Sequence, residues 1–140
     1  MPDLIVYTDG GARGNPGPAA IGVVIHDRTG KIVKELSAYI GETTNNQAEY
    51  EALVRALGEL KQMFGEELRG LQLEVRMDSE LVVRQLEGRY KVKDAGLKQQ
   101  FAKVEQMRME DAPNIMFVHI PRAENTRADA LVNDALDARL

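Results

Sequence analysis

Four acidic residues of this sequence stand where the surrounding pattern predicts apolar or neutral side chains. Asp9 follows an apolar, β-branched run, and Asp78 follows a run in which apolar and polar residues alternate. Glu49 and Asp129 fall on the apolar stripes of two predicted helices. Carboxylates that converge in one cleft repel each other unless protons or cations neutralise them. Because Mg²⁺ and similar dications prefer oxygen ligands, this pattern indicates a divalent-cation site.

Each of these acids also has a purely structural interpretation. Asn46 and Glu49 fit a capping box at the start of a helix, and an acid in a first turn, such as Asp129, favours the helix dipole. Asp78 and Ser79 could simply begin a helix. These interpretations leave unexplained why Glu49 and Asp129 continue apolar stripes, so the structural and the metal-binding interpretations both remain possible.

The elements that must position the acids follow from hydrophobic periodicity. Apolar residues alternate or run together in the strand segments and recur every three or four positions in the helical ones. The glycine- and proline-rich segment from Gly10 to Pro18 predicts a long turn. The resulting order, βββ-α-β-α-α-β-α, predicts an α/β domain with a mixed sheet. We expect strands at 4–9, 20–26, 31–40, 71–77 and 115–120, and helices at 48–64, just after Ser79, at 95–109 and at 128–136.

Composition limits the class of protein further. The chain has 140 residues, of which 44% are hydrophobic and 29% charged, which predicts a single domain spanning 1–140 with an ordinary core. The absence of cysteine excludes disulfides, thiolate metal sites and cysteine nucleophiles. No targeting or membrane segment is visible, so we expect a cytoplasmic protein, and no coiled-coil pattern is present, so we expect a monomer.

Charge is distributed unevenly along the chain. The formal net charge is −4, so the field of the whole protein does not attract nucleic acid. The segment 84–103 differs, because it carries six Lys or Arg residues and two acidic ones. Such a segment is either a solvated helix face or a local basic surface for phosphates.

Five motifs occur in order between Leu4 and about Leu136, and together they carry a family resemblance. The chain resembles ribonuclease H of type 1, in a form that lacks that family's Trp- and Lys-rich basic protrusion. The segment 87–96, where the protrusion would stand, is short and has no Trp. The motifs are Tyr7-Thr8-Asp9-Gly10-Gly11, Gly14-Asn15-Pro16-Gly17-Pro18, Thr43-Thr44-Asn45-Asn46-Gln47-Ala48-Glu49, Asp78-Ser79, and Glu124-Asn125 leading to Ala128-Asp129.

The resemblance implies both a fold and a reaction. The fold is the RNase H-like fold, a five-stranded mixed β-sheet flanked by α-helices. The reaction is endonucleolytic hydrolysis of the RNA strand of an RNA–DNA hybrid, giving 5′-phosphate and 3′-hydroxyl products. By the family's pattern Asp9, Glu49, Asp78 and Asp129 are the catalytic, metal-binding acids. The cofactors implied are two Mg²⁺ (or Mn²⁺) ions per site, which is the arrangement of two-metal phosphodiester hydrolysis.

The partner implied is the RNA–DNA hybrid, and no protein partner is evident. RNA is distinguished by its 2′-hydroxyl in a wide, shallow minor groove, where glycines allow close approach and asparagines can donate and accept. Where the family often carries a loop histidine, this chain has Arg122, which cannot transfer protons because it stays protonated. The candidate substrate-binding residues are Gly10, Gly11, Ala12, Asn15, Thr44, Asn45, Asn46, Arg89, Lys91, Lys93 and Arg122.

Two other functions remain open at this point. The chain could be a catalytically silent module that only binds hybrid or double-stranded RNA. The presence of all four acids argues against this, since a pure binder gains nothing from charges that repel phosphate. It could also be a DNA-directed nuclease of the same superfamily, although its asparagine-rich set favours RNA.

Overall fold

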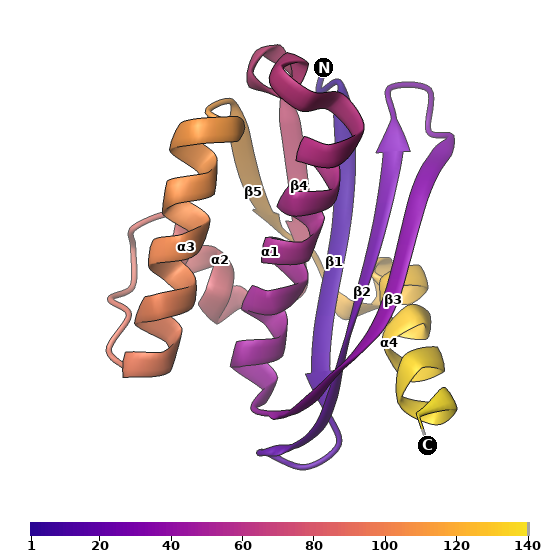
Figure 1. Ribbon diagram of the computed structural model, residues 1–140, viewed down its shortest axis with the longest axis vertical. Coiled ribbons are helices and arrows are strands. Elements are labelled where there is room, and N and C mark those ends of the chain that lie inside the picture. Colours follow the sequence, from indigo (N-terminus) through magenta and orange to yellow (C-terminus); the bar gives the residue numbers. More distant parts are fainter. Residues whose placement is uncertain (140) are drawn as a thin grey trace.

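The computed structural model describes residues 1–139, which form a five-stranded sheet with helices on both faces (Figure 1). The predicted order of elements and the mixed α/β class with a five-stranded sheet are both confirmed. In chain order the elements are β1 (Leu4–Ala12), β2 (Gly17–Asp27), β3 (Ile32–Thr43), α1 (Asn45–Phe64), β4 (Leu73–Met77), α2 (Glu80–Leu86), α3 (Ala95–Asp111), β5 (Ile115–His119) and α4 (Thr126–Ala138), with short 3₁₀ helices at Gly65–Gly70 and Arg122–Glu124.

The strand order β3-β2-β1-β4-β5 places β1 at the centre of the sheet. β1, β2 and β3 pair in antiparallel fashion, whereas β4 and β5 run parallel to β1. Thr8 on β1 pairs with Met77 at the end of β4, so Asp9 on β1 and Asp78, the first residue after β4, follow this pair on the two chain segments. Parallel strands end at the same edge of a sheet, which is where α/β proteins place their sites.

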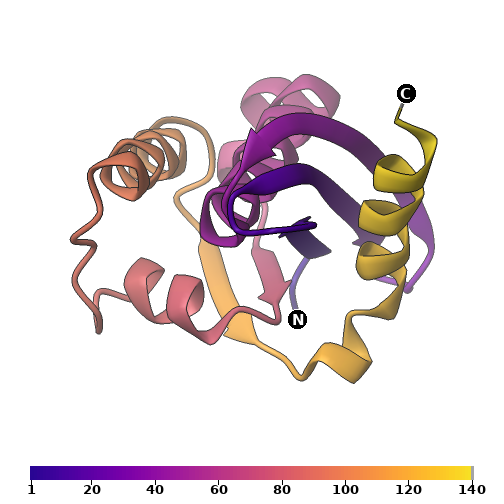
Figure 2. The ribbon, with the colours of Figure 1, turned by 90° about the horizontal axis from the view of Figure 1, so that it is seen from below.

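The two faces of the sheet are covered by different helices (Figures 1 and 2). Successive residues of a strand point to opposite faces, so β2 contributes to both layers. Ile21 and Val23 join the main core beneath α1, while Ala20 and Val24 pack against α4. α3 packs beside α1. The catalytic candidates therefore lie on elements from both layers, and the sheet holds these elements in fixed relation.

One expected segment differs from the prediction. The long turn predicted from Gly10 to Pro18 is shorter, because β1 continues to Ala12 and β2 already begins at Gly17. Gly10 pairs with Ile21 in the antiparallel ladder. Glycine tolerates an extended conformation as well as a turn, and here it is needed for close packing rather than for chain reversal.

Within residues 1–139, none of the helices has the length and apolar character that crossing a membrane requires.

Candidate active site

Asp9 projects from the central strand into a cleft at one end of the sheet. Its side chain is 7% exposed, and its partner across the β1–β2 ladder is Gly22. A Cβ at Gly22 would lie 2.3 Å from the carbonyl oxygen of Ala128, so the missing side chain lets α4 pack directly on β2. This close contact brings the following residue, Asp129, to the same cleft.

Glu49 reaches the cleft from the helix on the other face. Its Oε1 accepts a hydrogen bond from the backbone N–H of Gly10 at 2.6 Å, and the side chain is only 5% exposed. A Cβ at Gly10 would lie 2.2 Å from the backbone of Ala48. The glycine beside Asp9 is therefore what allows α1, and Glu49 with it, to approach β1.

The start of α1 corrects the capping interpretation of Glu49. Thr44 is the N-cap, and its Oγ1 accepts the backbone N–H of Gln47 at 3.2 Å. The helix begins at Asn45, so Asn46 lies within the first turn and cannot form a capping box with Glu49. The capping-box interpretation was wrong, and Glu49 is directed at the strand instead.

Asp78 is held by a buried asparagine. Asn125 is 1% exposed, and its Nδ2 donates to the backbone carbonyl of Thr8 at 2.9 Å and to Oδ2 of Asp78 at 3.2 Å. The backbone carbonyl of Asn125 accepts the N–H of Asp129 at 3.1 Å. One residue thus joins β1, the end of β4 and the first turn of α4.

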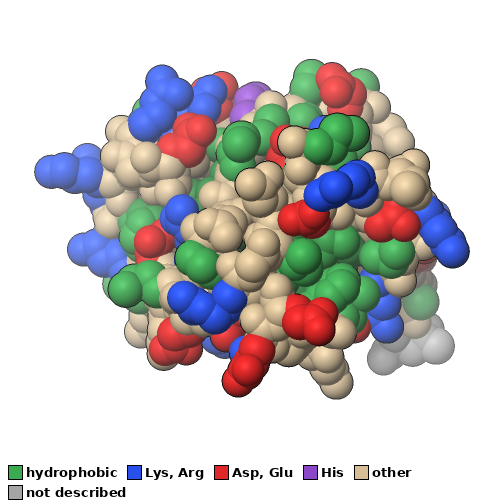
Figure 3. Space-filling view, turned by 90° about the horizontal axis from the view of Figure 1, so that it is seen from above, with side chains coloured by type: hydrophobic (Ala, Val, Ile, Leu, Met, Phe, Trp, Pro, Cys, Tyr) green, Lys and Arg blue, Asp and Glu red, His purple; other side chains and the backbone are tan. Residues whose placement is uncertain are grey.

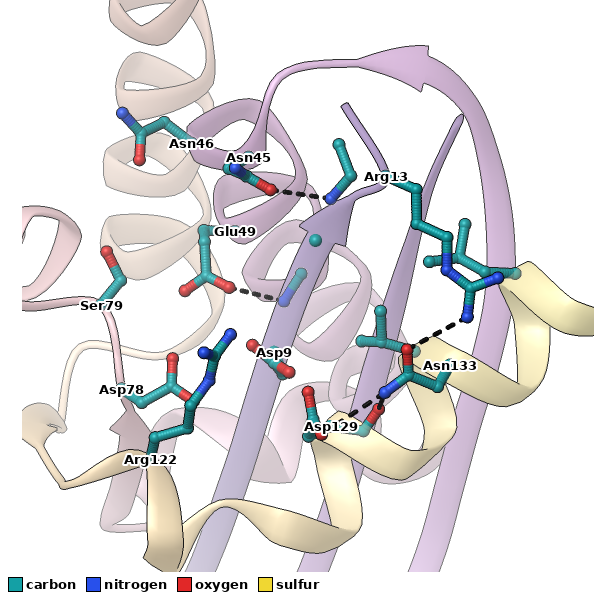
Figure 4. Close-up of a pocket in the computed structure, with 15 residues that line it drawn as sticks. Asp9, Arg13, Asn45, Asn46, Glu49, Asp78, Ser79, Arg122, Asp129 and Asn133 are labelled. Atoms are coloured by element: carbon teal, nitrogen blue, oxygen red, sulfur yellow. Dashed lines mark hydrogen bonds between the residues drawn. The ribbon is translucent and has the colours of Figure 1, made fainter. Parts of the chain in front are cut away.

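Asp129 lies in the first turn of α4, where an acid interacts favourably with the helix dipole. Nδ2 of Asn133, one turn later, lies 3.1 Å from the Asp129 carbonyl and 3.4 Å from its Oδ2 (Figure 4). Oδ1 of Asn133 in turn accepts a hydrogen bond from Arg13 at 3.3 Å. The dipole interpretation and the site interpretation of Asp129 are therefore compatible.

All four acids line one open cleft with a volume of about 320 Å³. Carboxylate oxygens of Asp9, Glu49 and Asp78 lie within 4.8 Å of one another, while Asp129 lines the cleft outside this group of three. The other residues that line the cleft are Gly10, Gly11, Ala12, Arg13, Asn45, Asn46, Ser79, Arg122, Val132, Asn133 and Leu136 (Figure 4).

Burial and mutual repulsion set the electrostatics of this cluster. Burial, followed by the charge of Asp78, raises the pKa of Asp9 from 3.8 to about 7. Burial, followed by the charge of Asp9, raises the pKa of Glu49 well above its ordinary 4.5. Arg122 counteracts part of this effect at Asp9. Without a bound cation, Asp9 and Glu49 therefore retain protons at a higher pH than free carboxyl groups do, as expected for carboxylates that share one site.

The donor atoms fit a divalent cation. Glu49 Oε2 is buried and has no hydrogen-bond partner among the described residues, although buried polar atoms are normally paired. It lies in a group whose three residues each offer a carboxylate oxygen, the ligand that hard dications select. A cation here would satisfy the unpaired oxygen and relieve the repulsion that raises the two pKa values.

The candidate substrate-binding residues fall into two groups. Six of them line the cleft with the acids, and two support its rim. Asn15 Oδ1 accepts the N–H of Asn45 at 3.0 Å, and Thr44 caps α1. The six that line the cleft are Gly10, Gly11, Ala12, Asn45, Asn46 and Arg122.

The remaining three, Arg89, Lys91 and Lys93, do not line the cleft. They lie on the exposed segment between α2 and α3, at the left of Figure 2. Figure 3 shows the end of the sheet that lies opposite to the cleft, where Lys and Arg side chains are interspersed with Asp and Glu side chains.

Sequence reasoning missed several residues that the tertiary structure brings to the site. Arg13, Ser79 and Asn133 line the cleft, and Asn125 holds Asp78. The sequence could have indicated Asn133, because it lies four residues after Asp129 and therefore on the same face of the predicted helix. Nothing in the sequence pairs Asn125 with Asp78, because their contact depends on how α4 enters the fold.

The central parallel pair, the two helical layers and the carboxylate cleft at the strand ends together define an RNase H-like domain. Comparison with known proteins makes the assignment specific. Residues 7–135 match the "Reverse transcriptase-like" family. Together with its similarity to ribonucleases H of type 1, this match shows that the chain belongs to the ribonuclease H type 1 family.

Proteins of known sequence and structure support this family assignment. Ribonuclease HI of Halobacterium salinarum is 44% identical over 131 residues, which cover 94% of this chain and 63% of that protein. A bifunctional protein of Mycobacterium tuberculosis is 38% identical over 136 residues, which cover 96% of this chain and 36% of that protein. This chain thus spans less than two thirds of the length of these relatives.

A ribonuclease H1 isolated from compost, LC11, is similar over nearly the full length of both chains. Its structure has a TM-score of 0.92 with 64% identity, and the match covers 98% of this chain and 97% of LC11. A second structure of LC11, in complex with an RNA/DNA hybrid, also has a TM-score of 0.92, with 63% identity and 96% coverage of both chains.

Proposed function

We propose that this protein is a metal-dependent endonuclease that hydrolyses the RNA strand of RNA–DNA hybrids and leaves 5′-phosphate and 3′-hydroxyl ends. The observation that carries the proposal is the group formed by Asp9, Glu49 and Asp78, whose carboxylate oxygens lie within 4.8 Å in an open cleft. The LC11 complex supports the choice of substrate, since that relative was crystallised with a hybrid.

The four acids are the residues that would hold the cofactor, which we propose to be two Mg²⁺ or Mn²⁺ ions. Such ions lower the pKa of the attacking water and stabilise the leaving oxygen. Asp9, on the central strand, would serve both ions, with Glu49 and Asp78 on the leaving-group side and Asp129 on the nucleophile side. The separation of Asp129 from the other three acids supports this division.

The asparagines at the rim are suited to donate hydrogen bonds to the substrate. Asn45 Oδ1 accepts the backbone N–H of Ala12 at 2.8 Å, and Asn15 Oδ1 accepts that of Asn45 at 3.0 Å. Since the protein already uses these amide oxygens, we propose that their NH₂ groups face the minor groove. Base acceptors and 2′-hydroxyl oxygens are the partners available there.

Other residues would shape the approach of the duplex. Gly11 has no side chain and Ala12 has a small one, so at these two positions of the cleft we propose that the duplex can approach the backbone closely. Gly10 contributes indirectly, because its missing side chain lets α1 bring Glu49 to the cleft. Arg122 lines the cleft and, as a permanent cation, would contact phosphate rather than move protons.

Phosphates outside the cleft need further contacts, from hydrogen-bond donors as well as cations. We propose that Thr44 at the rim, and the exposed Arg89, Lys91 and Lys93 on the α2–α3 segment, contact phosphates that flank the scissile bond. The four acids of a single chain converge in one cleft, so we also propose that a monomer suffices.

Cleavage of end-labelled substrates tests the function. We expect the protein to cut the RNA strand of a hybrid when Mg²⁺ or Mn²⁺ is present, and not when EDTA is. Asp9→Asn should abolish turnover while hybrid binding persists. Matched duplex DNA and double-stranded RNA of the same sequence serve as controls. Binding without cleavage under either metal would favour the silent module, and preferential cutting of duplex DNA would favour the DNA-directed nuclease.

A further inference from the structure

Arg13 places a second cation at the cleft, on the side opposite to Arg122. It lies in the turn between β1 and β2, and its backbone N–H donates to the carbonyl of Pro18 at 2.8 Å, which fixes the turn. In Figure 4 the guanidinium of Arg13 lies beside α4, whereas Arg122 lies on the side of Asp78, with the other acids between them. The cleft thus carries one arginine on each side of its carboxylates.

The side chain of Arg13 is held by two residues of α4. Its NH1 lies 2.7 Å from Oδ1 of Asp137, and its NH2 donates to Oδ1 of Asn133 at 3.3 Å. The side chains of Arg13 and Asp137 are 45% and 66% exposed. Exposed ion pairs of this kind contribute little to stability, because water and salt screen them. Arg13 can therefore exchange Asp137 for another anion without disturbing the fold.

Asn133 connects this arginine to the acid cluster. While its Oδ1 accepts from Arg13, its Nδ2 lies 3.4 Å from Oδ2 of Asp129. The amide orients the guanidinium at the edge of the cleft, close to the carboxylate most distant from the group of three. A phosphate that enters on this side meets Asp129, so it needs a cation at this position to offset the repulsion.

We propose that Arg13 is a phosphate-binding residue of the nucleic-acid interface, which Asp137 occupies when no duplex is bound. The two non-bridging oxygens of a backbone phosphate carry one negative charge, as the carboxylate of Asp137 does, and they can accept two N–H groups of the guanidinium at once, whereas Asp137 contacts NH1 alone. Asp137 then acts as an internal competitor, since a duplex must displace it. This inference rests on the proposed function.

The test measures hybrid binding without turnover. Fluorescence anisotropy with a labelled RNA–DNA hybrid, in Mg²⁺ and over a series of salt concentrations, is performed in an Asp9→Asn background. Adding Arg13→Gln should weaken binding roughly fivefold at low salt and reduce the slope of log K against log salt by about 0.9, the loss of one phosphate contact. Adding Asp137→Asn should tighten binding, and this gain should vanish when Arg13→Gln is also present.

Two control variants separate this exchange from a general charge effect. Arg28→Gln removes one positive charge in the turn between β2 and β3, at the other end of the sheet, and should leave the salt slope unchanged. Asp134→Asn removes one negative charge from the same helix as Asp137, and its effect should be equal with and without Arg13.

The outcomes distinguish this inference from the proposed function. An unchanged salt slope in Arg13→Gln, or an equal gain from Asp137→Asn in both backgrounds, would overturn the role of Arg13 while leaving the nuclease assignment intact. If the Asp9→Asn protein does not bind the hybrid and the parent protein does not cut it, the proposed function itself fails.

Discussion

The backbone N–H of Gly10 donates to Oε1 of Glu49 at 2.6 Å, and this bond joins the central strand to the helix that covers it. The contact exists because Gly10 has no side chain, since a Cβ there would lie 2.2 Å from the carbonyl carbon and oxygen of Ala48. The residue beside Asp9 thus sets the distance between the strand and the helix that carry two of the four acids.

Gly10→Ala should therefore be strongly destabilising. The new methyl group would meet backbone rather than a flexible side chain, so α1 must shift, at a cost of about 3 kcal/mol. Gly11→Ala is the matched control, because its Cβ would lie 3.7 Å from Val132 Cγ1, an ordinary contact. Urea unfolding monitored by circular dichroism compares the two. Equal stability of both variants would contradict this account of the packing.

Asn125→Ala should impair both stability and catalysis. It removes the donor that holds Oδ2 of Asp78 and leaves the buried carbonyl of Thr8 without this partner, which costs about 2 kcal/mol. Because Asp78 loses its orientation while the substrate surface is unchanged, we expect kcat for hybrid cleavage to fall at least tenfold, with KM nearly constant.

Asn114→Ala is the matched control for this variant. Asn114 Nδ2 also donates to a backbone carbonyl, that of Arg69 at 3.1 Å, but the contact is exposed and far from the cleft. We expect its kcat to equal that of the parent. If Asn125→Ala raises KM and leaves kcat unaltered, Asn125 does not position Asp78.

The raised pKa of Asp9 predicts how stability depends on pH in the absence of metal. In the folded protein this carboxyl keeps its proton up to about pH 7, whereas in the unfolded chain it loses the proton near its ordinary pKa of 3.8. The folded state binds more protons between these values, so the free energy of unfolding should fall as pH rises from about 4 to 7.

Asp9→Asn removes this titration. In EDTA the variant should be more stable than the parent at pH 8, by on the order of 2 kcal/mol, and the difference should shrink at pH 5. Urea unfolding at the two pH values measures it. A difference that does not change with pH would show that repulsion at Asp9 does not limit stability.

The core beneath α1 contains a buried polar pair outside the cleft. Tyr50 is fully buried, and its hydroxyl donates to Oε1 of Gln85 at 2.6 Å. Tyr50→Phe should destabilise the protein by about 1–2 kcal/mol, because the Gln85 oxygen loses this donor in an apolar environment. Tyr39→Phe, at a side chain that is 44% exposed, should change the melting temperature little. Differential scanning calorimetry compares the two, and equal shifts would contradict the assignment.

The sequence by itself determined the class of fold and singled out the four candidate acids. Periodicity is a local property, so the switch from alternation to a repeat of three or four residues located the strands and helices without knowledge of contacts. The same patterns exposed Asp9, Glu49, Asp78 and Asp129, because a carboxylate on an apolar stripe is conspicuous. Local signals were weaker at element ends, which is why the turn after β1 and the cap of α1 were misplaced.

The tertiary structure decided how those acids are held and which neighbours join them. The pairing of Thr8 with Met77 aligns Asp9 with Asp78, and it depends on a parallel ladder between strands far apart in the chain. The contacts of Asn125 with Asp78 and of Arg13 with Asp137 link residues that are 47 and 124 positions apart. Such contacts arise only when the helices have docked on the sheet, so no local pattern in the sequence encodes them.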